Sequence, residues 1–221
     1  MAFRLQLFHL SDPSAASNTI LDDIPRLSAV LAALRGQSVG ADANLTLGGG
    51  DTYLPGLFFS ASKDLYGTKG IADIEIQNQL GLDAAVVGNH EFDDGADTFA
   101  ELISGGSDVG SILGSAFRGT TYPYLSTNLD FSANDDLSPL VKPGGAAPQA
   151  NTITSSTVIT KGGEKIGVIG ATTPGLAFIT STDGVTARPV VSAQDLSDAE
   201  IDALAVEIQR EVDAVLAANP G

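Results

Sequence analysis

The chain has 221 residues, with 11 basic and 27 acidic side chains, a net charge of −16 and no cysteine. This length allows one domain with a sizeable core. The acidic balance argues against duplex nucleic acid as a partner, because such binding depends on Lys and Arg neutralising phosphates. The lack of cysteine excludes a disulfide framework and thiolate metal sites. No apolar run approaches the roughly 20 residues of a membrane span.

The first part of the chain predicts a strand followed by a helix. Residues 3–10 alternate loosely between apolar and polar positions, which indicates a strand in which His9 is a packed side chain. A helix is expected to begin at Asp22-Asp23, with Pro25 in its first turn, and to end at Gly36. Four apolar positions at helical spacing are expected in the core: Leu27, Val30, Leu31 and Leu34.

Two more strand-like runs follow. Residues 45–47 lead into Gly48-Gly49-Gly50, where glycines let the backbone approach a metal or phosphate closely. A helix is predicted over 71–80, closed by Gly81. It leads to the small apolar run 84–87, which is typical of a buried parallel strand. The order is therefore β-α-β-α-β before residue 90.

The second half of the chain predicts fewer parallel strands and an antiparallel element. A short helix, a loop, a strand and a surface loop are expected over 96–103, 104–119, 122–129 and 130–150 in turn. A turn at 161–164 separates two strand-like runs, 152–160 and 165–170, and indicates a hairpin. A further strand at 186–191 and a helix at 197–218 follow, the helix with an apolar face formed by Ile201, Leu204, Ile208, Val212 and Val215.

Polar side chains capable of chemistry follow three of these strands. Asp12, Asp51 and the group Asn89, His90 and Asp93 all lie at predicted carboxyl ends, where open α/β sheets place their ligands. Carboxylate, amide and imidazole groups are donors that hard or borderline divalent ions prefer. Each of these residues alone also fits an ordinary polar loop.

The motifs at these positions resemble a known family. Ser11-Asp12, Gly49-Gly50-Asp51 and Gly88-Asn89-His90-Glu91 resemble, in this order and spacing, the calcineurin-like metallophosphoesterases. Residues 7–12, 50–56 and 88–93 look most like the 5′-nucleotidase branch. The resemblance implies a four-layer αββα sandwich with mixed sheets, truncated at its C-terminus, with the site at the carboxyl ends of the strands.

The resemblance also implies roles for single residues. Asp12 matches the first carboxylate ligand, Asp51 the carboxylate that bridges two metals, and Asn89 an amide ligand. His90 and Asp93 match the pair in which a histidine, oriented by an aspartate, stabilises or protonates the departing alkoxide. The implied reaction is the attack of water on a nucleotide phosphomonoester. Two divalent ions (Mn, Zn, Fe, Co or Mg) would serve as cofactors.

This chain departs from the family pattern in two ways. Ser14 stands where the family usually has His or Glu, which weakens the first metal site. The chain has two histidines, His9 and His90, whereas the family carries further histidine segments and a nucleotide-binding domain later in its sequence. Residues 1–221 are therefore expected to be the N-terminal part of the catalytic domain.

Several expectations follow from that incompleteness. The alternative to a hydrolase is a non-catalytic or incomplete fragment with weak metal binding and no turnover by itself. Missing strands would expose a sheet edge, so self-association is expected. The family implies a secreted or periplasmic protein, although no signal peptide is present in this chain. A weaker third interpretation is a calcium-binding module at Asp93-Asp94-Gly95 and Asn134-Asp135-Asp136.

Overall fold

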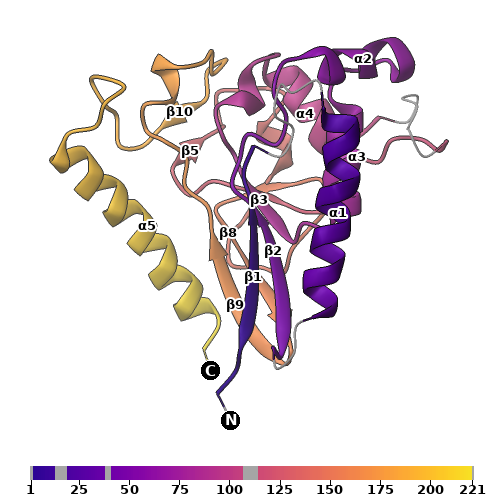
Figure 1. Ribbon diagram of the computed structural model, residues 1–221. Helices are drawn as coiled ribbons and strands as arrows, with labels where there is room; N and C mark the ends of the chain where they lie inside the picture. The colour runs from indigo at the N-terminus through magenta and orange to yellow at the C-terminus, as the bar shows by residue number, and fades with distance from the viewer. Residues whose placement is uncertain (1, 13–18, 38–40, 107–113, 221) are drawn as a thin grey trace.

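The elements of the chain stack as helix, sheet, sheet and helix (Figure 1). The computed structural model describes residues 2–12, 19–37, 41–106 and 114–220. Helices α1 and α3 form the first layer, a parallel sheet the second, a β-hairpin the third and helix α5 the fourth. This is the αββα order that the sequence predicts.

The parallel sheet has six strands in the order β1-β2-β3-β4-β7-β6. Leu10 of β1 pairs with Gly48 of β2, and Leu47 of β2 pairs with Ala84 of β3. The first three strands therefore end side by side. The strand bounds are β1 Leu5–Leu10, β2 Ala43–Gly48, β3 Ala84–Val86, β4 Tyr124–Leu125, β6 Val141–Lys142 and β7 Ile153–Thr154.

Helices α1 Ile20–Gly36, α3 Ile71–Leu80 and α4 Ala96–Ser104 contribute to the main core on one side of this sheet. Helix α2 Leu57–Tyr66 packs on α3, and its Phe59 lies in a second, smaller cluster. The predicted helix over 71–80 is confirmed, and the one over 96–103 extends one residue further. Helix α2 was not predicted. It buries Phe59 and Ser62 while Leu57 and Leu65 stay exposed, so its apolar residues do not form one buried stripe.

The third layer is the predicted hairpin. Its strands are β8 Ser156–Lys161 and β9 Glu164–Ile169, and the turn glycines 162 and 163 have φ values of 61° and 86°. Positive φ at both central residues suits a tight hairpin turn. Lys161 Nζ lies 2.7 Å from the Asp83 carboxylate and ties the hairpin to the end of α3 and the start of β3.

The fourth layer is α5, Asp198–Ala218, which packs on β8 and β9. It begins with a capping box in which the Ser197 and Glu200 side chains bond each other's backbone N–H. Of the predicted apolar face, Val215 is buried and Ile201 is exposed. The helix rests on a two-stranded hairpin, which is too narrow to cover the whole stripe.

Parallel and antiparallel pairing fall in separate sheets among the described residues. The run expected as one strand over 122–129 divides into β4 and β5 Leu129–Asp130, and β5 pairs with β10 Thr186–Ala187. The intervening Asn128 binds the backbone of Thr172 and Arg188. The segment 130–150, expected as a surface loop, contains β6 at the outer edge of the parallel sheet.

The prediction that all four apolar positions of α1 lie in the core is wrong. Leu31 is 3% exposed and Leu27 packs against the core, but Val30 is 53% and Leu34 40% exposed. Only one narrow stripe of helix α1 packs against the rest of the protein. Leu27 and Leu31, spaced i and i+4, form that stripe.

The prediction that His9 is packed is also wrong. β1 is an outer strand, and its residues Leu5, Leu7 and His9 are exposed, whereas Phe8 points into the helical core. The exposed residues occupy the face turned toward the second sheet, which no described element covers at this position. The exposed sheet edge expected from missing strands, and the self-association that would follow from it, stay predictions.

Among the described residues, no helix is both long and apolar enough to cross a membrane.

Candidate active site

The two predicted carboxylate ligands follow neighbouring strand ends. Asp12 lies two residues after β1, and Asp51 lies three residues after β2. Both have left-handed backbone conformations, with φ of 48° and 51°. Such conformations are uncommon outside glycine, and they persist where the surrounding structure enforces them, often at functional sites.

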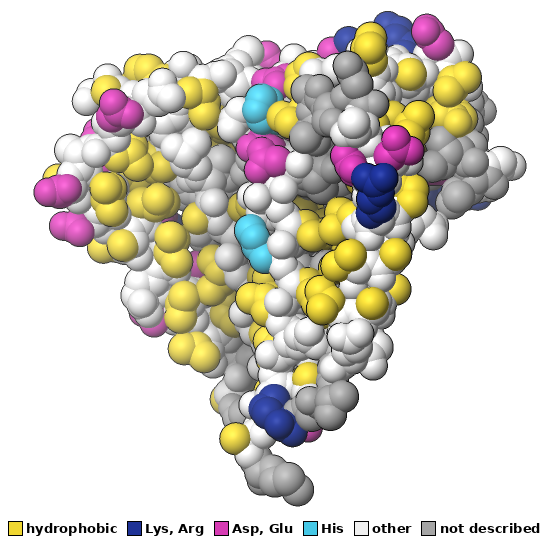
Figure 2. Space-filling view, viewed as in Figure 1, with side chains coloured by type: hydrophobic (Ala, Val, Ile, Leu, Met, Phe, Trp, Pro, Cys, Tyr) yellow, Lys and Arg dark blue, Asp and Glu magenta, His cyan; other side chains and the backbone are white. Residues whose placement is uncertain are grey.

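Asp51 is fastened to the loop that follows β3. Its Oδ1 accepts a hydrogen bond of 2.9 Å from the His90 backbone N–H. Gly88 allows this approach, because a Cβ at this position would lie 2.6 Å from the Asp51 backbone N. Three of the predicted site residues, Asp51, Asn89 and His90, are thus brought together. Figure 2 shows histidine and acidic side chains gathered on this face.

The predicted pair of His90 and Asp93 is present in the 3₁₀ helix η1, His90–Phe92, and its cap. His90 Nδ1 lies 2.5 Å from Asp93 Oδ2, while Thr180 Oγ1 donates to the other oxygen of Asp93 at 3.4 Å. Partial burial lowers the pKa of His90, but the hydrogen bond and charge of Asp93 outweigh it, and the net pKa is raised. This contact orients the imidazole ring and favours its protonated form.

The sequence interpretation gave no role to Glu91, which the structure buries completely, at 0% exposure. Its carboxylate accepts hydrogen bonds from the backbone of Gly88, Asp51 and Thr52 and from the Thr52 hydroxyl. Burial raises the pKa of Glu91 to about 6, against the lowering effect of these bonds. The sequence signal that could have indicated a buried Glu91 is its position directly before Phe92, where the chain returns to the core.

Hydroxyl groups continue this network into the core. The Tyr53 hydroxyl donates to the Glu91 carbonyl at 2.8 Å, and Thr52 Oγ1 lies 2.5 Å from the Tyr124 hydroxyl. Burial holds the pKa of both tyrosines well above the ordinary value, so both hydroxyls stay protonated. The site loops therefore rest on a rigid, hydrogen-bonded base.

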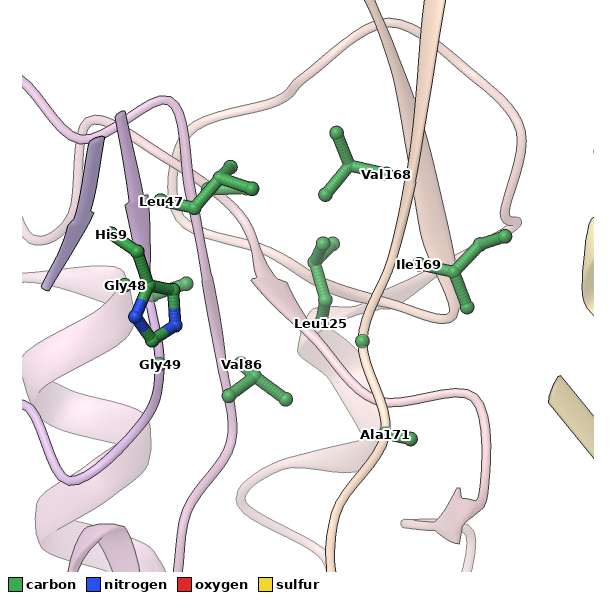
Figure 3. A pocket seen from close by; sticks show the side chains of 12 residues that line it. His9, Leu47, Gly48, Gly49, Val86, Leu125, Val168, Ile169 and Ala171 are labelled. Carbon is green, nitrogen blue, oxygen red and sulfur yellow. The ribbon is translucent and has the colours of Figure 1, made fainter. Parts of the chain in front are cut away.

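A cavity of about 260 Å³ lies beside the site, between the parallel sheet and the end of β9 (Figure 3). His9 lines it, next to Gly49, Val86 and Val168. A Cβ on Gly49 would lie 2.8 Å from two atoms of the His9 ring. Gly49 thus lets the imidazole lie over β2 at the wall of the cavity.

The donor types at the site fit a divalent ion, but the donor number is small. Asp12, Asp51 and Asn89 offer carboxylate and amide oxygens, which hard ions prefer. Within the described part of the chain, no three His, Cys, Asp or Glu side chains form a group able to hold a metal. Ser14 lies outside the described residues. An ion bound here would need further ligands.

One side chain or more in each expected calcium segment is already engaged. Asp94 forms an ion pair with Lys69. Asn134 is buried, and its Oδ1 accepts hydrogen bonds from the backbone N–H groups of Asp136 and Leu137, at 3.1 and 2.8 Å. These contacts are those of an ion pair and a turn cap, and they disfavour the calcium interpretation.

Similarity to known proteins was found at the level of sequence and of structure, and no family model matches the chain. A trifunctional nucleotide phosphoesterase, YfkN of Bacillus subtilis (strain 168), is 29% identical over 221 residues, covering 96% of this chain and 14% of that protein. A snake venom 5′-nucleotidase of Gloydius brevicauda is 30% identical over 131 residues, covering 58% of this chain and 17% of that protein.

The fold is that of solved 5′-nucleotidase structures. A 5′-nucleotidase precursor from Thermus thermophilus superimposes with a TM-score of 0.62 at 22% identity, covering 98% of this chain and 35% of that one. The chain spans less than a fifth of the length of the two sequence relatives above. Its sequence is therefore similar to 5′-nucleotidases and nucleotide phosphoesterases, and it shares the fold of solved 5′-nucleotidases.

Proposed function

We propose that this chain contributes part of the active site of a metal-dependent phosphoester hydrolase, namely the residues that follow the carboxyl ends of the parallel strands. The substrate of this site would be a nucleotide phosphomonoester. The observation that carries the proposal is the bond between Asp51 and the His90 backbone, which joins an oxygen donor to the His90–Asp93 pair. The names of the sequence relatives support the substrate class.

In this proposal each residue keeps the role that its position suggests. Asp12, Asp51 and Asn89 would hold divalent ions, which would neutralise phosphate charge in a chain whose net charge is −16. His90 is the proton carrier. Because Asp93 engages Nδ1, Nε2 is the ring atom left to donate a proton to the departing alkoxide.

We further propose that residues 1–221 form one part of a larger catalytic domain that acts outside the cytoplasm. The match to only 14% and 17% of the length of two relatives supports a larger catalytic domain. The venom origin of one of them supports a place outside the cytoplasm. The alternative, an incomplete module with weak metal binding and no turnover by itself, is favoured by the small donor number within the described residues.

The first test is metal stoichiometry by elemental analysis after dialysis against Mn²⁺. The variant Asp51→Ala removes a proposed ligand, and Asp64→Ala removes an exposed carboxylate on α2 as a matched control. About two metals per chain in the wild type and the control, and fewer in Asp51→Ala, would support the hydrolase. Metal near zero in all three would support the incomplete module.

Turnover provides the second test. Hydrolysis of AMP by the Mn²⁺-loaded protein should fall by roughly 10²–10⁴ in kcat for His90→Gln, as expected for loss of a general acid. Equal rates for this variant and the wild type would rule out the proposed role of His90.

A further inference from the structure

The buried carboxylate of Glu91 connects the two loops that carry the proposed ligands. Oε2 accepts hydrogen bonds from the backbone N–H of Gly88 at 2.7 Å and of Asp51 at 3.0 Å. Oε1 accepts the backbone N–H and the hydroxyl of Thr52, both at 2.7 Å. One side chain therefore binds the loop after β2 and the loop after β3 at the same time.

The link between these loops is reciprocal. Glu91 binds the backbone N–H of Asp51, and the backbone N–H of His90 binds the Asp51 carboxylate at 2.9 Å. The Tyr53 hydroxyl holds the Glu91 backbone carbonyl at 2.8 Å. Glu91 therefore fixes the backbone of Asp51, and the neighbouring His90 fixes the Asp51 side chain.

We propose that Glu91 is a positioning residue that sets the separation between Asp51 and the Asn89–His90 segment before any ion binds. The inference rests on the proposed metal-dependent function of the same site. Its physical basis is preorganisation, in which ligand-bearing loops held in place from outside the ligand set bind an ion without first being ordered.

A carboxylate is the group that this position requires. All four of the contacts above come from N–H or O–H donors, and both oxygens of a carboxylate accept. A glutamine of the same shape would turn its NH₂ group toward two of these donors. Glu91→Gln should therefore disrupt two of the four hydrogen bonds, either those from Gly88 and Asp51 or those from Thr52, while keeping the side-chain volume.

The test compares Glu91→Gln with Glu101→Gln, a matched control. The Glu101 carboxylate accepts a hydrogen bond from Thr68 Oγ1 at 2.7 Å, outside the two loops. Amide hydrogen exchange is measured by NMR on the metal-free proteins, and Mn²⁺ binding by calorimetry. In Glu91→Gln we expect at least tenfold faster exchange at the amides that face the glutamine NH₂ group, which are those of Asp51 and Gly88 or that of Thr52, and at least tenfold weaker Mn²⁺ binding.

Unchanged exchange at these amides, or unchanged Mn²⁺ affinity, in a folded Glu91→Gln variant would overturn the proposal. If the wild type binds no Mn²⁺, the proposed function fails, and the exchange measurement still decides whether Glu91 holds the loops. If Glu91→Gln does not fold, Thr52→Val removes one donor only, and a smaller acceleration, about threefold, at Asp51 and Gly88 is expected. No acceleration in Thr52→Val would then refute the link.

Discussion

Replacing Gly88 by alanine tests how tightly the site loops meet. The added Cβ would contact Asp51 Oδ1, lie 2.6 Å from the Asp51 backbone N and lie 2.8 Å from Glu91 Oε2. Real Cβ atoms do not approach other atoms this closely, so one loop must move. The φ angle of Gly88 is not in the left-handed region, so the effect is steric and separate from backbone strain.

The expected cost follows from these contacts. Overpacking of a tight site costs about 1–3 kcal/mol. Movement of the loop would also weaken the hydrogen bonds that Gly88 and Asp51 donate to Glu91, at about 1 kcal/mol each. We expect Gly88→Ala to lower the free energy of unfolding by about 3–5 kcal/mol, which is roughly 6–20 °C in Tm for a chain of this size.

Urea unfolding followed by circular dichroism measures this change. Gly36→Ala at the end of α1 is the matched control, because nothing lies within 4 Å of its added Cβ. It should be neutral or stabilise by up to about 1 kcal/mol, since alanine is the better helix former. A Gly88→Ala protein whose free energy of unfolding matches the wild type within about 0.5 kcal/mol would refute the close approach of the two loops.

Two further substitutions test the histidine pair and the packing of α1. Asp93→Asn should lower the pKa of His90 in the metal-free protein, as followed by NMR with His9→Gln for assignment. Because the pKa of His90 is raised in the folded wild type, the protonated ring stabilises it at pH below about 6.5. This contribution is lost as the pH rises through the folded-state pKa. A His90 pKa that is the same in Asp93→Asn and the wild type would contradict the pairing. Leu31→Ala should cost about 2–5 kcal/mol in urea unfolding, whereas Val30→Ala should stay within about 0.5 kcal/mol, and equal costs would contradict the burial of one stripe only.

The local elements were largely predictable from the sequence. The helix at 71–80 and the hairpin at 156–169 agree with the structure because their signals are local: a terminal glycine, and a glycine turn between β-branched runs. The grouping of Asp51, Asn89 and His90 was predictable for a related reason. Parallel strands bring their carboxyl ends to the same edge of a sheet, so residues after such strands must meet.

Burial and hydrogen-bond partners were decided by the tertiary structure alone. Periodicity shows which residues of an element share a face, but it does not show whether another element covers that face. His9 and Val30 are exposed because no described element covers them, although their spacing is that of core residues. Glu91 is buried because four donors from separate loops converge on it, and residues up to 40 positions apart meet there. Such contacts depend on how the loops are placed in space, which short-range sequence patterns do not encode.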